Sequence, residues 1–74
     1  MLLSLLKPKQ KGKIKNIKDK VGLKERFMRM GLIPGEIIEI VRVAPLGDPV
    51  EILVKGYHLS LRKKEAECIE IESD

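Results

Sequence analysis

The sequence has few aromatic residues and few of the side chains that usually perform chemistry. Phe27 and Tyr57 are its only aromatic residues, so its core must be aliphatic, built from Ile, Val and Leu. Cys68 is the only cysteine, which excludes an internal disulfide and is compatible with a reducing cytosol. His58 is the only histidine. A His/Cys metal cluster therefore cannot be assembled within one chain.

Long apolar runs are absent as well. No stretch has the length and apolarity needed to cross a bilayer, and the Leu-rich segment 1–6 lacks the basic region and small-residue cleavage site of a secretory signal. We therefore expect a soluble protein. Its 74 residues suffice for one domain, residues 1–74, which would bury only about 60% of the surface of the unfolded chain. A large enclosed enzyme cavity has little room in such a domain.

Residue patterns for catalysis are also missing. No serine lies beside a plausible base, and segment 31–35 lacks the Lys and the Ser or Thr of a phosphate-binding loop. We expect His58 to be an exposed strand residue and Cys68 a small packing residue. The acidic residues near the C-terminus are expected to form a solvated edge and a frayed end rather than a cation site: Glu65, Glu67, Glu70, Glu72 and Asp74. We expect no enzymatic activity, no cofactor and no metal ligands.

Basic residues are abundant and unevenly distributed. Residues 1–35 carry ten Lys and Arg against Asp19 and Glu25, whereas residues 36–74 carry five against nine acidic residues. The two halves should attract each other and leave a basic face. Five lysines recur at every second position, which places them on one side of an extended strand: Lys7, Lys9, Lys11, Lys13 and Lys15. Ile14 and Ile17 are three residues apart, so we expect a bulge or strand end near Asn16.

One short amphipathic helix should follow this strand. Leu23, Phe27 and Met30 recur at the helical spacing of an inward stripe. Asp19 could cap a helix beginning at Lys20, and a start nearer Gly22 is equally compatible. We expect Gly31 to end the helix in the left-handed conformation, with Leu32 folding back onto the last turn.

Downstream of the helix, the apolar period changes from that of a helix to two. Strands are predicted over residues 36–44, 50–55 and 57–62, with a final strand containing Ile69 and Ile71 and a single helical turn over residues 63–66. Chain reversals are predicted at six positions: Gly31, Pro34, Gly35, Gly47, Pro49 and Gly56, with Pro34 and Gly35 suited to a type II turn. About five short strands with one helix after the first predict a mainly β protein that forms a small closed or nearly closed barrel.

The lysine stripe raises the possibility of nucleic-acid binding, because phosphate contacts need little more than positioned cations. However, small barrels that hold single strands usually add stacking aromatic residues, and this sequence has only two aromatic residues. We therefore favour a solvated strand face and expect no nucleic-acid partner. A groove for proline-rich peptides is less favoured still, because such grooves are lined by aromatic residues.

A set of short motifs in a fixed order resembles the ferrous iron transport protein A (FeoA) family. The motifs run from about Ser4 to Glu72: Met30-Gly31-Leu32-Ile33-Pro34-Gly35, Ala44-Pro45-Leu46-Gly47-Asp48-Pro49, Gly56-Tyr57, Leu61-Arg62, Glu65-Ala66 and Ile69. The resemblance implies an SH3-like barrel in a small cytoplasmic prokaryotic protein. It also implies that the protein functions together with the membrane ferrous iron transporter that carries a cytosolic G domain (FeoB). Related SH3-like domains occur at the C-terminus of iron-dependent repressors.

The sequence departs from the family pattern at two positions. Lys9 stands where members commonly place Gly after the proline that matches Pro8, which affects the turn expected there. Leu53 is apolar at a strand position where alternation and the family both lead us to expect a polar residue. Beside other apolar groups, an exposed Leu53 could extend a docking patch.

These observations lead us to expect a non-enzymatic accessory protein of ferrous iron uptake that docks on the transporter and regulates or assembles it. It would be peripheral to the membrane through its partner only, and the iron would belong to the transporter. Candidate contacts, chosen for expected exposure, are Lys24, Met28, Arg29, Leu46 and Leu53. The alternatives are a basic barrel that binds nucleic acid and a metal-sensing SH3-like domain related to the iron-dependent repressors.

Overall fold

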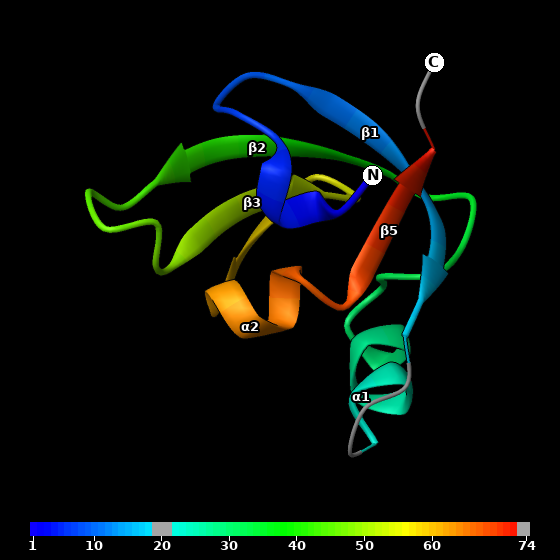
Figure 1. Cartoon of the computed structure of the whole chain (residues 1–74). Helices are drawn as coiled ribbons and strands as arrows, with labels where there is room; N and C mark the ends of the chain where they lie inside the picture. Colours follow the sequence, from blue (N-terminus) through cyan, green and yellow to red (C-terminus); the bar gives the residue numbers. More distant parts are fainter. Residues whose placement is uncertain (19–21, 73–74) are drawn as a thin grey trace.

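In the computed structural model, which describes residues 1–18 and 22–72, five antiparallel strands form one strongly curved sheet (Figure 1). The strands are β1 (Lys11–Ile17), β2 (Ile37–Val43), β3 (Val50–Val54), β4 (Tyr57–Leu61) and β5 (Ile69–Glu72). Their order across the sheet is β4-β3-β2-β1-β5, and within the described residues no ladder joins β4 to β5. The predicted mainly β architecture of a nearly closed barrel is therefore confirmed.

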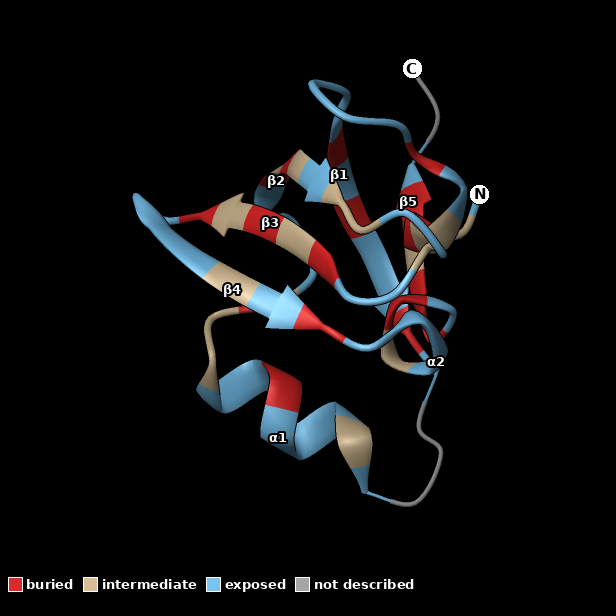
Figure 2. Ribbon diagram, turned by 90° about the vertical axis from the view of Figure 1, so that its left-hand side faces the viewer, coloured by how far each residue is buried: buried red, intermediate tan, exposed pale blue. Residues whose placement is uncertain are grey.

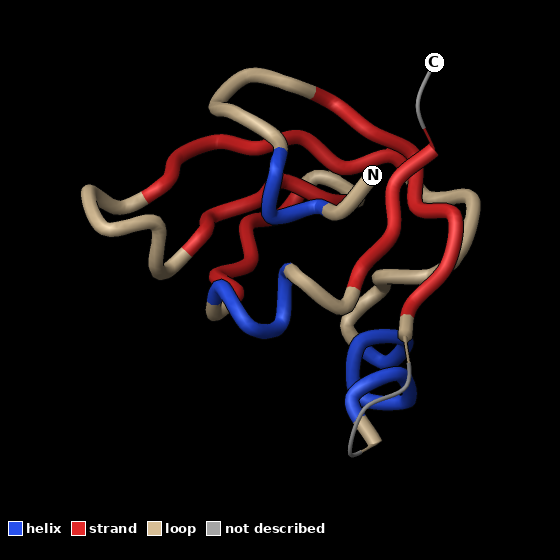
Figure 3. Tube along the Cα trace, in the orientation of Figure 1, coloured by secondary structure: helices blue, strands red, loops and turns tan. Residues whose placement is uncertain are grey.

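Within the described residues, three short helices complete the fold, and they are the blue segments of the tube view (Figure 3). The 3₁₀-helix η1 (Leu3–Leu5) precedes β1, α1 (Leu23–Arg29) follows it, and α2 (Lys63–Ala66) connects β4 to β5. Helix α2 is the single turn that the sequence predicts. The prediction of one helix did not include η1, because a leucine-rich opening segment has no helical period of its own.

The predicted first strand is partly wrong. Strand β1 begins at Lys11, whereas residues 7–10 form a turn in which the Gln10 N–H donates to Lys7 O at 3.0 Å. Lys9 has a φ of 74°, in the left-handed region that the family's glycine would adopt without strain. The five lysines are nevertheless all exposed. The expected bulge is confirmed, since the pairing of β1 with β5 shifts register between Ile14 and Asn16.

Helix α1 ends as predicted. Gly31 has a φ of 93°, its N–H donates to Met28 O at 3.1 Å, and the Leu32 N–H donates to Phe27 O at 2.9 Å. These two bonds define a Schellman motif. At the other end the N-cap is Gly22, so the later of the two helix starts is the observed one. The alternative cap, Asp19, lies outside the described residues.

The remaining turns also agree with the sequence. Gly35 has a φ of 95° and the Glu36 N–H donates to Ile33 O at 3.1 Å, which closes the Pro34–Gly35 turn. Lys55 and Gly56 both have positive φ, 50° and 82°, as the two central residues of a type I′ hairpin require. Between β2 and β3, the loop is closed by a bond from Ala44 N–H to Pro49 O at 3.1 Å.

The core is aliphatic except for one aromatic ring, and Figure 2 shows it as the buried positions of the strands and of α1. Phe27 is completely buried and is the only residue of α1 that is. The N-terminal segment adds Leu3 and Leu6, which the sequence analysis did not place in the core. The other buried hydrophobic side chains are Ile14, Ile17, Leu32, Ile38, Ile40, Val50, Ile52, Val54, Leu61, Ala66, Cys68, Ile69 and Ile71.

Candidate docking surface

Helix α1 stands at one end of the molecule and exposes most of its side chains (Figure 2). Its outer face forms what we call the α1 patch: Lys24, Met28 and Arg29, with Gly22 and Glu25 beside them. These residues line an open depression of about 480 Å³. The Met28 side chain, 45% exposed, supplies the apolar part. The α1 patch is therefore a small apolar surface bordered by charged side chains.

The charges of the α1 patch leave it basic. The Arg29 guanidinium donates to the Glu25 carboxylate one turn earlier, and both side chains are highly exposed. Such an exposed pair adds little stability, about 0.3–0.5 kcal/mol, so it can exchange partners readily. Lys24 has no hydrogen bond or ion pair with any described residue. The patch therefore favours an acidic surface with an apolar centre.

Leu46, another candidate contact, lies at the tip of the loop between β2 and β3 and is 91% exposed. The Gly47 N–H donates to Ala44 O at 2.7 Å, so a tight turn holds the tip out from the sheet. In Figure 1 this loop lies at the opposite side of the molecule from α1. Leu46 and the α1 patch therefore belong to separate surfaces.

Leu53, the last candidate contact, is only half-buried and lies on the outer face of the sheet. It pairs with Glu39 on β2 and with His58 on β4. Together with Ile37 and Lys55 it lines a shallow depression of about 190 Å³. Ile37, 61% exposed, was missed by the sequence analysis. The sequence could have predicted this exposure, because neighbours on a strand point to opposite faces and one of the adjacent pair Ile37 and Ile38 must therefore face outward.

The five candidate contacts thus occupy three places. The structure brings Lys24, Met28 and Arg29 together on α1, and separates them from Leu46 and Leu53. The depression at the first group, about 480 Å³, is larger than the one beside Leu53, about 190 Å³.

The lysine stripe faces neighbouring acidic residues. Lys11 on β1 is the cross-strand partner of Glu39 on β2, and Lys13 is the partner of Glu72 on β5. The Lys18 ammonium lies 3.9 Å from the Glu70 carboxylate. Opposite charges on adjacent strands lower the positive potential along β1. This arrangement fits a solvated strand face better than a surface for phosphates.

The described residues hold no group of three His, Cys, Asp or Glu side chains that could coordinate a metal ion. His58, exposed as predicted, has its Nδ1 atom 2.9 Å from Glu51 Oε2. Cys68 is buried as predicted, and its Sγ donates to Lys64 O at 3.4 Å. No charged or polar side chain of residues 1–18 and 22–72 is buried. Apart from the Cys68 thiol, the titratable side chains of these residues therefore reach the surface.

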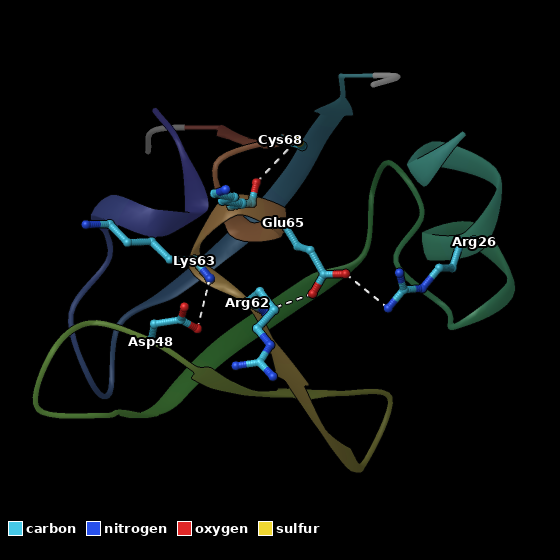
Figure 4. A network of polar contacts seen from close by, with 7 residues as sticks. Arg26, Asp48, Arg62, Lys63, Glu65 and Cys68 are labelled. Atoms are coloured by element: carbon cyan, nitrogen blue, oxygen red, sulfur yellow. Dashed lines mark hydrogen bonds and ion pairs between the residues drawn. The ribbon is translucent and has the colours of Figure 1, made fainter. Parts of the chain in front are cut away.

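A polar network joins α1 to α2 and was not found from the sequence (Figure 4). The Arg26 guanidinium lies 3.0 Å from the Glu65 carboxylate, whose side chain is only 12% exposed. The same carboxylate accepts from the Arg62 N–H at 2.8 Å, and Asp48 accepts from the Lys63 N–H at 3.3 Å. The expectation that Glu65 forms part of a solvated acidic edge is therefore wrong. The sequence does contain one signal for this contact: a Glu three residues after the N-cap residue of a helix, here Arg62, can accept from the backbone N–H of that residue.

This network borders a second open depression, of about 500 Å³. Arg26 of α1 lies on one side of it, and Ser60, Leu61 and Arg62 from the end of β4 lie on the other. Pro49 and Glu65 complete its lining. We call it the β4 groove.

None of the helices in the described part of the chain is long and apolar enough to cross a membrane.

Three kinds of comparison with known proteins agree with one another. The family model for the FeoA domain matches residues 1–73. A fusion of Fe(2+) transport protein A with the Fe(2+) transporter FeoB from Porphyromonas gingivalis is 35% identical over 72 residues. Those residues are 97% of this chain and only 8% of the fusion protein, so the chain corresponds to a small part of that relative.

Two solved structures share the fold. The solution structure of iron(II) transport protein A from Clostridium thermocellum is 46% identical with a TM-score of 0.90, covering 97% of this chain and 44% of that one. The zinc complex of FeoA from Stenotrophomonas maltophilia, a procaryotic SH3 domain protein, has a TM-score of 0.86 at 24% identity. The match covers 97% of this chain and 89% of that one. The fold is therefore SH3-like.

Proposed function

The chain belongs to the FeoA family, associated with ferrous iron transport, and we propose that it is an accessory protein that docks on the cytosolic part of a FeoB-type transporter. The resemblance inferred from the sequence motifs thus identified the family correctly. The proposal concerns what the chain binds and where on its surface the partner lies.

The fusion protein of Porphyromonas gingivalis is the observation that carries the proposal. In it a segment similar to this whole chain is joined in one polypeptide to FeoB. A covalent link raises the effective concentration of two modules and so favours contact between them, whereas separate chains must bind each other by affinity alone. We infer that this chain makes the corresponding contact as a separate protein. Its site of action is then the cytosol, at the membrane only through its partner.

The distribution of polar groups supports an accessory role rather than an enzymatic one. The described core holds aliphatic side chains, Phe27 and a hydrogen-bonded Cys68, while the charged side chains lie at the surface. An acid–base or nucleophilic site needs titratable groups held together in a cleft, where their pKa values are shifted. A chain built this way acts through its exterior, and in the proposed complex the ferrous ion stays with the transporter.

We place the docking contact on the α1 patch. Met28 offers an apolar anchor, and Lys24 and Arg29 offer charges to an acidic rim on the transporter. Apolar anchors at the centre of an interface carry most of its free energy, while charges at the rim mainly set the association rate. To regulate the transporter, the patch must contact its conformational states unequally. Leu46 and Leu53 remain candidate contacts on two further surfaces.

Calorimetric titration of the chain into the purified cytosolic region of a FeoB-type transporter tests the proposal. We expect saturable binding, weakened about tenfold or more by Met28→Asp, because a charge replaces the apolar anchor. Leu5→Asp is the matched control, since Leu5 is exposed on η1 and lies outside the α1 patch. Leu46→Asp reports whether the loop tip also takes part.

The possible outcomes separate the levels of the proposal. No binding by the unmodified chain would contradict docking itself. Binding that Met28→Asp and Leu5→Asp weaken equally would remove the α1 patch from the contact while leaving the partner in place. Loss of affinity in Leu46→Asp alone would move the contact to the loop between β2 and β3.

A further inference from the structure

The two edges of the sheet are treated differently by the rest of the chain. At β5 the N-terminal segment runs along the edge: the Ile71 N–H donates to Met1 O at 2.6 Å, and Leu2 forms a bridge with Glu70. At β4 the described residues provide no comparable cover, since its ladder is with β3 alone. One edge is therefore closed and the other is open.

The open edge presents backbone groups at alternate residues. Tyr57 and Val54 flank the two-residue turn, so they form the closing hydrogen-bonded pair of the hairpin. Because hydrogen-bonded and non-hydrogen-bonded pairs alternate along an antiparallel ladder, His58 and Ser60 direct their N–H and C=O groups away from β3. Both residues are exposed. No described group donates to or accepts from these backbone atoms.

Strand β4 itself lacks the sequence features that usually protect an edge, and α1 beside it is attached only through side chains. The five residues of β4 include no Lys, no Pro and no inward-pointing charge, and its pairing with β3 continues without a bulge from Val54–Tyr57 to Val50–Leu61. Natural sheets use such features to prevent another strand from pairing with an exposed edge. Here β4 is left as a regular template for one more strand.

Basic side chains gather beside this edge. Arg62 and Arg26 line the β4 groove. Arg42 lies farther in, on β2, two strands from the edge, where Glu51 is its cross-strand partner. Arg62 has no ion pair with any described residue. Of the acidic residues nearby, Glu65 lies 3.0 Å from the Arg26 guanidinium, and Glu51 faces Arg42 across the ladder of β2 and β3. The unpaired charge at the end of the edge is therefore that of Arg62.

We propose that the β4 edge binds an extended acidic segment of a partner protein as an added sixth strand, with a carboxylate meeting Arg62 at the end of the edge. Strand addition draws affinity from main-chain hydrogen bonds, here to His58 and Ser60, and selectivity from the side chains on either side. Guanidinium groups bind carboxylates with paired, charge-assisted hydrogen bonds. The surface is distinct from the α1 patch, and the inference goes beyond docking on the transporter.

A second copy of the chain is a poorer occupant of this edge. Antiparallel pairing of two β4 strands through His58 and Ser60 would bring Arg62 next to the Lys55–Gly56 turn of the other copy. Two cations would then be placed together at each end of the added ladder, which opposes pairing. An acidic segment meets no such repulsion.

NMR titration of the isotope-labelled full chain with a short, end-blocked peptide in which Glu alternates with Val tests the proposal. We expect the amide signals of His58 and Ser60 to shift and their hydrogen exchange to slow, while those of α1 stay unchanged. The control peptide, with Lys in place of Glu, should bind at least about tenfold more weakly, because it meets arginines.

Two variants separate backbone pairing from charge. Ser60→Pro removes an outward N–H without removing a bond to β3, a position that tolerates Pro on an edge strand, and it should weaken peptide binding about tenfold or more. Arg62→Glu should weaken binding about tenfold, whereas Lys64→Glu, the same change of charge on α2, should leave the affinity within about twofold. If Ser60→Pro fails to fold, the comparison of Arg62→Glu with Lys64→Glu still tests whether the peptide binds at the β4 edge.

Several results would overturn the proposal. Signal shifts confined to α1, equal binding of the Lys peptide, or equal losses in Arg62→Glu and Lys64→Glu would each exclude strand addition guided by Arg62. A dimer of the unmodified chain in sedimentation equilibrium that Ser60→Pro dissociates would show that the edge pairs with a second copy instead.

Discussion

The two edges of the sheet show how one short chain closes one side of a barrel and leaves the other accessible. At β5, Met1 and Leu2 extend the ladder, and Leu3 and Leu6 anchor the segment in the core. At β4, the neighbour is α1, which is attached by the buried Phe27 and by a hydrogen bond from the Tyr57 hydroxyl to Met30 O. A segment that pairs with an edge strand through its backbone satisfies the N–H and C=O groups of that strand. A helix attached by side chains leaves those groups without a partner.

This difference locates the proposed interactions. Both the α1 patch and the β4 groove lie on the α1 side of the molecule, and Arg26 of α1 lines the groove itself. The β5 side is occupied by the chain's own N-terminal segment. The four test substitutions below, three of them with a matched control, alter one side at a time, and they are ordered by the expected loss of stability.

Removing the anchor of α1 should have the largest effect. Phe27→Ala empties a completely buried site and should cost about 3–5 kcal/mol of unfolding free energy, a large part of the total for a chain of this size. Urea denaturation followed by circular dichroism measures the loss. Met28→Ala, on the exposed face of the same helix, should change stability by no more than about 0.5 kcal/mol. Equal losses in the two variants would contradict the assignment of α1 as a helix held by one ring.

Loosening the cover of β5 should rank second. Leu3→Ala should cost about 2–3 kcal/mol, at the low end for buried leucine because a terminal segment can relax around the cavity. Leu5→Ala, on the exposed side of η1, is the matched control and should cost less than about 0.5 kcal/mol. The Ile71 amide, bonded to Met1 O, should exchange faster in the Leu3 variant only. Unchanged Ile71 exchange there would show that β5 does not depend on this cover.

The connection between α1 and β2 provides a finer test. Gly31→Ala should cost about 2 kcal/mol, because φ is 93° and the new Cβ would lie 2.7 Å from the Tyr57 hydroxyl oxygen. Gly35→Ala has a similar φ of 95° with no atom within 4 Å, so it should cost only about 1 kcal/mol. Thermal denaturation of both variants gives the difference. Equal costs would mean that Tyr57 moves freely away from Gly31.

The smallest expected effect comes from the hydroxyl group of Tyr57. Tyr57→Phe removes its hydrogen bond to Met30 O on the surface and should cost about 0.5–1 kcal/mol, without changing the core. The same denaturation assay measures it. A loss as large as that of Phe27→Ala would instead make this bond, rather than the buried ring, the main attachment of α1.

Local signals in the sequence predicted much of this fold. The Schellman end at Gly31, the Pro34–Gly35 turn, the bulge near Asn16 and the helical turn at residues 63–66 each follow from a few adjacent residues. Such features depend on backbone sterics and on alternation, which a short window of sequence contains. The family resemblance then supplied the SH3-like arrangement of the strands.

Contacts between distant residues were not predictable in this way. Nothing within residues 1–6 indicates pairing with β5, about 70 residues later, and the Leu-rich pattern suits several structures. The ion pair of Arg26 with Glu65 joins two helices that only the folded barrel brings together. The separation of Leu46 from the α1 patch likewise depends on the three-dimensional path of the chain. The exposure of Met28 and Leu46 could be predicted from the sequence, but which exposed residues share a surface could not.

The most direct test of the account is amide hydrogen exchange of the full chain, measured alone and with the purified cytosolic region of a FeoB-type transporter. Docking through the α1 patch predicts slower exchange for the amides of Leu23–Arg29 in the complex, and unchanged exchange for Ile71 at the covered edge. Unchanged exchange throughout α1 at saturating transporter, or slower exchange confined to the N-terminal segment and β5, would contradict it.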